Sequence, residues 1–402
     1  MRYEKKRSAS RRTVIKGLGA GLGLAAAASF PAPFVRAQSA PVKGGILLPS
    51  SGTYAKLGDA LTNAMMLNIA ENGDTLGGRP VEYIKLDSEA APPKATENTN
   101  KLILSDKVDF LVGPVHSGVA MGMAKIAREE GVITIVPNAG ADQITGPLCA
   151  PNVFRTSFTN WQPSFPMGKV LLDKGLKNVA LCYWNYGAGK QSAQGFIDGF
   201  VPNGGTIVKE IGVPFPEVEF QAALTEIAAA NPDAVYVFFA GGGAVKFVKD
   251  YAAAGLKDSI PLYGSGFLTE GVTQAQGAAA EGIQTTLHYA DTLDNPENKA
   301  FRAAYKEKFG AEADVYAVQG YDTGTLMRIG MDAVGGDMEA KNDLIAAMDQ
   351  ADFASPRGPF KLSAAHNPVQ NFYLREVKNG VNEVISVAYE GLADPAKGCT
   401  MG

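Results

Sequence analysis

From Gly44 onward, short apolar runs alternate with longer segments whose apolar residues recur at helical spacing. Such alternation is typical of a parallel β-sheet covered by helices, because each parallel connection is long enough to hold a helix. The sequence therefore predicts an α/β fold with doubly wound sheets. The candidate strands are residues 45–49, 81–87, 110–112, 133–136, 179–184, 206–213, 234–239, 261–264 and 282–288.

The alternation is interrupted after Cys149 and starts again at Lys177. A chain of this length exceeds what one hydrophobic core usually serves, so two lobes are expected. After Asp291 two helical segments follow without a strong strand between them, which predicts a return to the first lobe. We expect lobe 1 to comprise residues 42–157 and 289–353, and lobe 2 residues 158–288 and 354–402.

Two alternating segments near the C-terminus predict a β-hairpin. Residues 371–377 and 383–389 flank Asn379-Gly380. An Asn-Gly pair suits a type I′ turn, which matches the twist of the two strands that it joins.

The first 37 residues have the features of an export signal. The run Ser10-Arg11-Arg12-Thr13-Val14-Ile15-Lys16 matches the twin-arginine pattern, and an apolar stretch and a small-residue cleavage site at Ala37 follow it. The apolar stretch is far shorter than the roughly 20 residues of a membrane span, which favours removal over anchoring. We expect residues 1–37 to be a twin-arginine signal peptide and the mature protein to work in the periplasm.

The mature chain would be acidic. Removing residues 1–37 takes away eight Lys or Arg and one Glu, which leaves a formal net charge of about −11. An acidic chain without a basic stripe argues against nucleic acid as a partner.

Three cysteines remain in a compartment where disulfides persist. Cys182 lies within an apolar run and is expected to be buried in a strand. Cys149 and Cys399 lie in loop-like contexts, and if one bridge forms we expect it to join these two.

Catalytic and metal-binding patterns are missing from the sequence. His116, His288 and His366 are its only histidines, none at metal-ligand spacing, and no catalytic motif accompanies them. We therefore expect no enzyme activity, no metal and no cofactor. Gly241-Gly242-Gly243 follows a strand and opens a helix, where a tight turn is favoured over an anion-binding loop.

Ser117 lies where an apolar strand has ended and a helix should begin. One interpretation is a helix N-cap. The other is a ligand site, because ligands bind outside the carboxyl ends of parallel strands and a helix start suits a carboxylate. The two interpretations are compatible.

The order of these segments resembles the periplasmic branched-chain amino-acid binding protein family over essentially the whole mature chain. The landmarks are Ser51 to Gly58, Gly113 to Ser117, Pro137 to Gly140, Phe154 to Thr156 and Tyr186-Gly187. The resemblance implies a type I periplasmic binding fold with three crossovers and a ligand cleft between the lobes.

The resemblance also implies which residues meet the ligand. Ser117 would hold a carboxylate, helped by backbone groups of Asn138 and Ala139. The family's amino-acid binders usually have Thr where this chain has Gly140, so a hydroxyl is lost there. Further expected ligand-binding residues are Tyr186 from the second lobe and Leu57 and Tyr54 from the first. The last three are Phe239, Gly266 and Phe267.

The departure with the largest consequence is at Gly266 and Phe267. Amino-acid binders of the family place a carboxylate in this loop to pair the ligand's α-ammonium, and an unpaired ammonium in a closed cleft would be costly. We therefore expect a small carboxylate without an α-amine. Phe267, Phe239 and Tyr186 would give an aromatic lining, which suits an aromatic acid such as a benzoate or phenylpropanoid. Phe239 ends an apolar strand and fits the core as well as the cleft. Glu270 keeps an amine or amide ligand as an alternative.

The function expected from these features is that of a solute-binding protein of an ABC importer, a monomer that delivers a small organic acid to a membrane permease. The alternatives are a branched-chain amino-acid or amide binder, or a ligand-sensing subunit of a signalling system.

Overall fold

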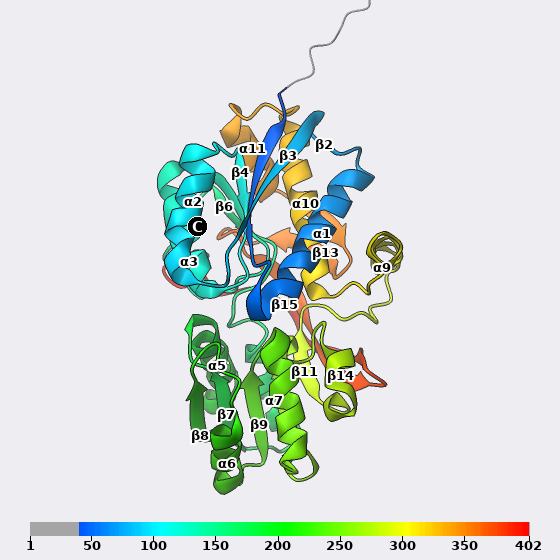
Figure 1. Ribbon diagram of the computed structural model, residues 1–402. Helices are drawn as coiled ribbons and strands as arrows, with labels where there is room; N and C mark the ends of the chain where they lie inside the picture. Colours follow the sequence, from blue (N-terminus) through cyan, green and yellow to red (C-terminus); the bar gives the residue numbers. More distant parts are fainter. Residues whose placement is uncertain (1–39, 402) are drawn as a thin grey trace, which may run out of the picture. The chain divides into compact units, whose positions relative to one another are not determined.

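The computed structural model describes residues 40–401. The predicted signal peptide therefore lies outside the described residues. Residues 40–401 form two β-sheets with helices packed against them (Figure 1). No helix in this range has an apolar stretch long enough for a bilayer crossing. The predicted two-lobed α/β architecture is confirmed.

The first sheet has the strand order β2-β3-β1-β4-β5-β6 and is parallel except at β2. Its strands are β1 (Val42–Leu48), β2 (Thr75–Leu76), β3 (Arg79–Asp87), β4 (Phe110–Val112), β5 (Ile133–Val136) and β6 (Val153–Arg155). The strand order reverses at β1, since β3 lies on one side of it and β4 on the other. A crevice that can take a ligand opens at the carboxyl ends beside such a reversal.

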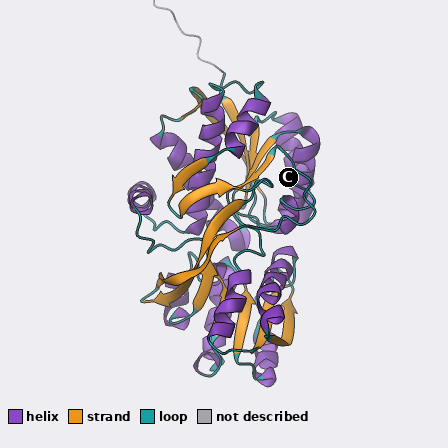
Figure 2. Ribbon diagram, turned by 180° about the vertical axis from the view of Figure 1, so that it is seen from behind, coloured by secondary structure: helices purple, strands orange, loops and turns teal. Residues whose placement is uncertain are grey.

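The second sheet has the order β12-β13-β14-β11-β10-β9-β7-β8, with β15 paired to β14. Strands β7 to β11 are parallel, and the pairs that involve β12 to β15 are antiparallel. Figure 2 shows both sheets from behind. The strands are β7 (Asn178–Trp184), β8 (Thr206–Val213), β9 (Ala234–Phe238), β10 (Leu262–Ser265), β11 (Gln284–Leu287), β12 (Asp352–Ser355), β13 (Gly358–Leu362), β14 (Pro368–Lys378) and β15 (Val381–Leu392).

Most of the longer helices follow a strand, as the alternation predicts. They are α1 (Ala55–Glu71), α2 (Pro92–Asn100), α3 (Ser117–Glu130), α4 (Phe165–Asp173), α5 (Gly187–Phe200), α6 (Gln221–Ala230), α7 (Gly241–Ala253), α8 (Thr273–Gln276), α9 (Pro296–Phe309), α10 (Val315–Ala333) and α11 (Lys341–Asp349). The short turns of helix are η1 (Gly52–Tyr54), η2 (Lys101–Ser105), η3 (Asp142–Ile144), η4 (Val201–Asn203), η5 (Leu256–Asp258), η6 (Gly266–Leu268) and η7 (Gly277–Ala280).

Helix α10 lies beside α1, although the two are far apart in the sequence (Figure 1). The close approach needs a residue without a side chain, because a Cβ added at Gly320 would lie 2.2 Å from the Leu61 carbonyl oxygen. The Asn68 amide donates a hydrogen bond of 2.9 Å to the Thr325 hydroxyl across the same contact. The chain therefore passes from β11 to the helices beside α1 before β12 takes it back to the second sheet.

The C-terminal hairpin is confirmed. Strands β14 and β15 pair antiparallel, and the turn residues Asn379 and Gly380 have φ angles of 51° and 77°. Strand β12 begins at Asp352 and belongs to the second sheet, two residues before the predicted start of lobe 2 at residue 354. The exact lobe boundaries stay a prediction.

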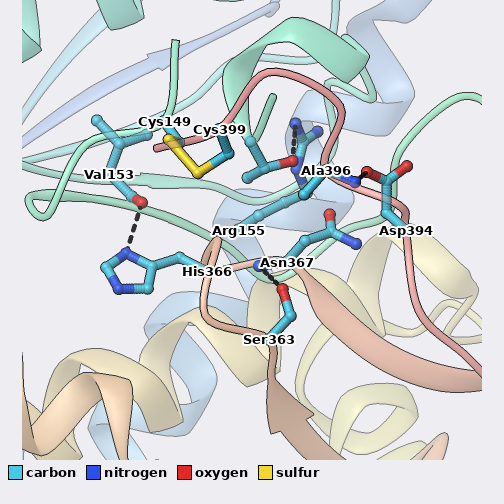
Figure 3. The surroundings of a disulfide bond; sticks show 10 residues. Cys149, Val153, Arg155, Ser363, His366, Asn367, Asp394, Ala396 and Cys399 are labelled. Atoms are coloured by element: carbon cyan, nitrogen blue, oxygen red, sulfur yellow. Dashed lines mark hydrogen bonds between the residues drawn. A yellow bond between two sulfur atoms is a disulfide. The ribbon is translucent and has the colours of Figure 1, made fainter. Parts of the chain in front are cut away.

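A disulfide joins Cys149 to Cys399, which is the predicted pair, with 5.5 Å between the two Cα atoms. Figure 3 shows the C-terminal tail, with Asp394 and Ala396, held beside Arg155 by this bond. The Thr159 hydroxyl donates to the Asp394 carboxylate at 2.7 Å, a second link between the tail and the segment after β6. The thiol of Cys182 is free and buried, as expected.

Candidate functional site

A small cavity of about 20 Å³ lies where the carboxyl ends of strands from both sheets meet. This volume is well below the usual range for small-molecule sites. The lining residues follow β1, β4, β5 and β6 in the first lobe and β7, β9 and β10 in the second, with one more from α10. They are Tyr54, Leu57, Val115, Ser117, Asn138, Gly140, Phe158, Asn160, Tyr186, Ala188, Phe238, Ala240, Phe267 and Tyr316.

Ser117 lines this cavity and is not the cap of its helix. Helix α3 is capped by His116, whose Nδ1 accepts a 3.0 Å hydrogen bond from the Gly118 amide. Burial lowers the pKa of His116 to about 4, which keeps this nitrogen available as an acceptor at neutral pH. The Ser117 oxygen itself accepts a bond of 3.2 Å from the Asn160 amide, so its proton is free to be donated to a ligand.

Ala139 does not line the cavity, contrary to the expectation that its backbone would meet the ligand. Its N–H donates to the Pro114 carbonyl at 3.0 Å, and its carbonyl accepts from Arg155 at 2.6 Å. Arg155 is fully buried and also donates to the carbonyls of Phe158 and Ala141. One guanidinium thus fixes the loop after β5 and the start of the segment after β6, which together form one wall of the site.

Gly140 and Asn138 both lie in the cavity wall, as expected. A Cβ added at Gly140 would lie 2.3 Å from the Asn160 side-chain oxygen and 2.6 Å from the Phe158 ring. The space that a threonine would need at residue 140 is therefore taken up by Asn160. The Asn138 amide donates to the Gln319 side chain at 2.8 Å, so this bond ties the wall to α10.

Three helices begin at the cavity, and no Asp, Glu, Lys, Arg or His is among the described residues that line it. The helices are α3 at Ser117, α5 at Gly187 and α7 at Gly241. The first two lie close together, since a Cβ added at Gly187 would be 4.0 Å from the Ser117 Cβ. Helix N-termini carry partial positive charge and unpaired N–H groups, which favour an anion and disfavour an ammonium.

Aromatic side chains form most of the remaining wall. The Tyr54 and Tyr186 hydroxyls lie 3.0 Å apart and join residues of the two lobes. Burial raises the pKa of both phenols, so they stay neutral. The Phe267 ring lies 4.7 Å from the Phe158 ring and 6.4 Å from the Phe238 ring, measured between centroids. The cavity therefore combines an apolar aromatic wall with a polar end at Ser117.

Phe239, which was expected in the cleft, belongs to the core instead. Its ring packs 4.5 Å from Phe247 and 5.0 Å from Phe220, and it is completely buried. Successive residues of an extended segment point to opposite sides, so its neighbour Phe238 faces the cavity in its place.

Gly266 also lies outside the lining, and the structure explains why a residue with a side chain does not fit there. A Cβ at this position would lie 2.4 Å from the Leu287 Cβ and 2.6 Å from an Arg375 nitrogen. The Gly266 carbonyl accepts a bond of 3.0 Å from Arg375. The carboxylate that the family resemblance leads us to expect here has no room at this position.

Glu270, the alternative partner for a ligand amine, is not in the cavity lining. It forms a buried ion pair of 2.5 Å with Arg375 and accepts the backbone N–H of Val315 at 2.8 Å. Both side chains are at most 1% exposed. Glu270 is therefore already paired, and the structure offers it no contact with a ligand amine.

Asp314 caps α10 next to this ion pair, and its Oδ1 accepts the Ala317 N–H at 2.9 Å. Burial, with the nearby Glu270 charge, raises the Asp314 pKa to about 7. Between about pH 4 and pH 7 the folded state therefore binds more protons than the unfolded state, so the contribution of Asp314 to stability is lost as the pH rises through 7.

We therefore predict that Asp314→Asn increases the free energy of unfolding at pH 8 by about 2 to 4 kcal/mol and leaves it nearly unchanged at pH 4. Asparagine retains the cap and removes the charge. Urea unfolding at the two pH values measures this difference, with the exposed Asp258→Asn as the matched control. An equal effect at both pH values would show that the buried charge is not its cause.

The structure therefore places seven of the ten predicted ligand-binding residues around one cavity. These are Tyr54, Leu57, Ser117, Asn138, Gly140, Tyr186 and Phe267. The lining residues that sequence reasoning missed are Val115, Phe158, Asn160, Ala188, Phe238, Ala240 and Tyr316. Phe158 and Asn160 directly follow the Phe154-Arg155-Thr156 landmark. Their position after this landmark was the sequence feature that could have identified them.

Residues 41–382 match the family model described as periplasmic binding protein. The chain belongs to the periplasmic binding protein family. A relative of this periplasmic binding protein is the Leu/Ile/Val-binding protein homolog 6 of Brucella melitensis, which is 32% identical over 89% of this chain and 92% of the relative.

Two solved structures are also similar to this periplasmic binding protein, and both are solute-binding proteins of ABC transporters. One from R. palustris, in complex with benzoate, is 55% identical with a TM-score of 0.88, over 90% of this chain and 99% of that one. The other, from Rhodopseudomonas palustris BisB5, is in complex with 3,4-dihydroxy benzoic acid. It is 34% identical with a TM-score of 0.83, over 88% of this chain and 99% of that one.

Proposed function

We propose that this chain is the solute-binding protein of an ABC importer and captures a small aromatic carboxylate without an α-amine, of the benzoate class. The observation that carries the proposal is the character of the cavity. Three helix N-termini meet an aromatic wall, and no acidic side chain is among the described lining residues. Such a site favours the negative charge and the apolar ring of one molecule.

The loop after β10 supports the same conclusion. The Gly266 site has no room for a side chain, and Glu270 is paired with Arg375. An α-ammonium in the cavity would therefore lack the anionic partner that its burial requires. The benzoate-bound structure at 55% identity agrees with this ligand class.

The place of action is part of the proposal. We infer that residues 1–37 direct export through the twin-arginine route and are removed, and that the mature protein works as a periplasmic monomer. Closure of the lobes over the ligand would then present one closed surface to a membrane permease.

A thermal-shift screen of the mature protein tests the ligand class. Benzoate at about 100 times its dissociation constant is expected to add about 2.7 kcal/mol of stability. The comparison ligands are benzamide, aliphatic acids and leucine. Benzamide has the aromatic ring without the negative charge. All of them are expected to raise the unfolding temperature less than benzoate does. A response to leucine without a response to benzoate would support the branched-chain amino-acid alternative instead.

A further inference from the structure

Tyr316 lines the cavity and carries a buried hydroxyl. It is the second residue of α10, its side chain is 1% exposed, and it lines the site. Its phenol oxygen has no hydrogen-bond partner among the described residues. A buried hydroxyl without a partner costs free energy, and a ligand that supplies the partner recovers it.

Each of the other polar side chains of the lining makes at least one hydrogen bond. The Tyr54 and Tyr186 hydroxyls bond each other, the Asn138 amide bonds Gln319, and Asn160 donates to Ser117. Among the described lining residues, Tyr316 thus has the one side-chain oxygen that is buried and left without a partner. This singles out its hydroxyl as a group that a ligand can satisfy.

The position of Tyr316 indicates which part of the ligand it would meet. Its ring lies 6.2 Å from the Phe267 ring, within the aromatic wall. A benzoate ring placed against Phe267 with its carboxylate at Ser117 would turn its ring substituents toward this wall.

We infer that the Tyr316 hydroxyl is a specificity-determining group that hydrogen-bonds a hydroxyl substituent on the aromatic ring of the ligand. This inference rests on the proposed function and narrows its substrate class to hydroxylated benzoates.

The test measures the dissociation constants of benzoate, 3-hydroxybenzoate and 4-hydroxybenzoate by titration calorimetry, for the mature wild type and for Tyr316→Phe. The wild type is expected to bind one hydroxybenzoate more tightly than benzoate. Tyr316→Phe should weaken that hydroxybenzoate about tenfold more than it weakens benzoate, the usual loss for one hydrogen bond.

Tyr251→Phe is the matched control, because it removes a buried hydroxyl that bonds the Ile260 carbonyl away from the site. It should leave all three constants unchanged. An equal loss for benzoate and the hydroxybenzoates in Tyr316→Phe would assign the hydroxyl to the carboxylate and overturn the inference. Unchanged dissociation constants in Tyr316→Phe would also overturn the inference. A wild type that binds benzoate and neither hydroxybenzoate would overturn it as well. A wild type that binds no benzoate of any kind would overturn the proposed function itself.

Discussion

Replacing Arg375 with methionine is expected to lower the free energy of unfolding by about 3 to 5 kcal/mol, the usual loss when one partner of a buried ion pair is removed. The guanidinium bonds the Glu270 carboxylate at 2.5 Å and the carbonyls of Tyr289 and Gly266 at 2.7 and 3.0 Å. Its loss would leave Glu270 charged and unpaired at 1% exposure. Burial already raises the Glu270 pKa, and removing Arg375 would raise it further.

Urea unfolding at pH 7 measures this loss. The double variant Glu270→Gln/Arg375→Met is expected to recover much of it, because no unpaired charge then remains. The matched control is Arg328→Met, whose partly exposed pair with Asp332 should contribute less than about 1 kcal/mol. A change below 1 kcal/mol in Arg375→Met would contradict the view that Glu270 depends on this partner.

Replacing Ser117 with alanine is expected to weaken benzoate binding by about 1.5 to 3 kcal/mol, roughly a factor of 10 to 150 in the dissociation constant. The Ser117 hydroxyl lies at the start of α3 with its proton free, because Asn160 bonds its oxygen. The stability of the ligand-free protein should change little, since His116 and not Ser117 caps the helix.

Calorimetric titration of Ser117→Ala with benzoate, together with its thermal unfolding without ligand, separates the two roles. The exposed Ser50→Ala, at the end of β1 and outside the cavity lining, is the matched control. Unchanged affinity with a loss of stability would leave Ser117 with a structural role only.

Much of the site could be predicted from the sequence because its residues follow strands. Ser117, Asn138 and Tyr186 come directly after apolar runs, and parallel strands bring their carboxyl ends to one edge. The prediction of Phe239 was wrong by one residue. An apolar run does not show at which residue its strand ends, so the side that Phe238 and Phe239 each face could not be assigned.

Other parts of the molecule left no local signal. Tyr316 reaches the cavity only because α10 packs on α1 through the small residue Gly320, a contact between segments more than 250 residues apart. Strands β12 and β13 are short and contain Asp352, Pro359 and Lys361, so neither is clearly apolar. They form because β14 offers an edge with which β13 can pair.

The account rests on a site that accepts an aromatic carboxylate and rejects an α-ammonium. Phenylacetate and phenylglycine differ only in that group, so calorimetric titration of the mature protein with both tests the claim most directly. We predict saturable binding of phenylacetate and binding of phenylglycine at least about 100-fold weaker, because burying an unpaired ammonium costs several kcal/mol. Phenylglycine binding as tightly as phenylacetate, or more tightly, would contradict the account.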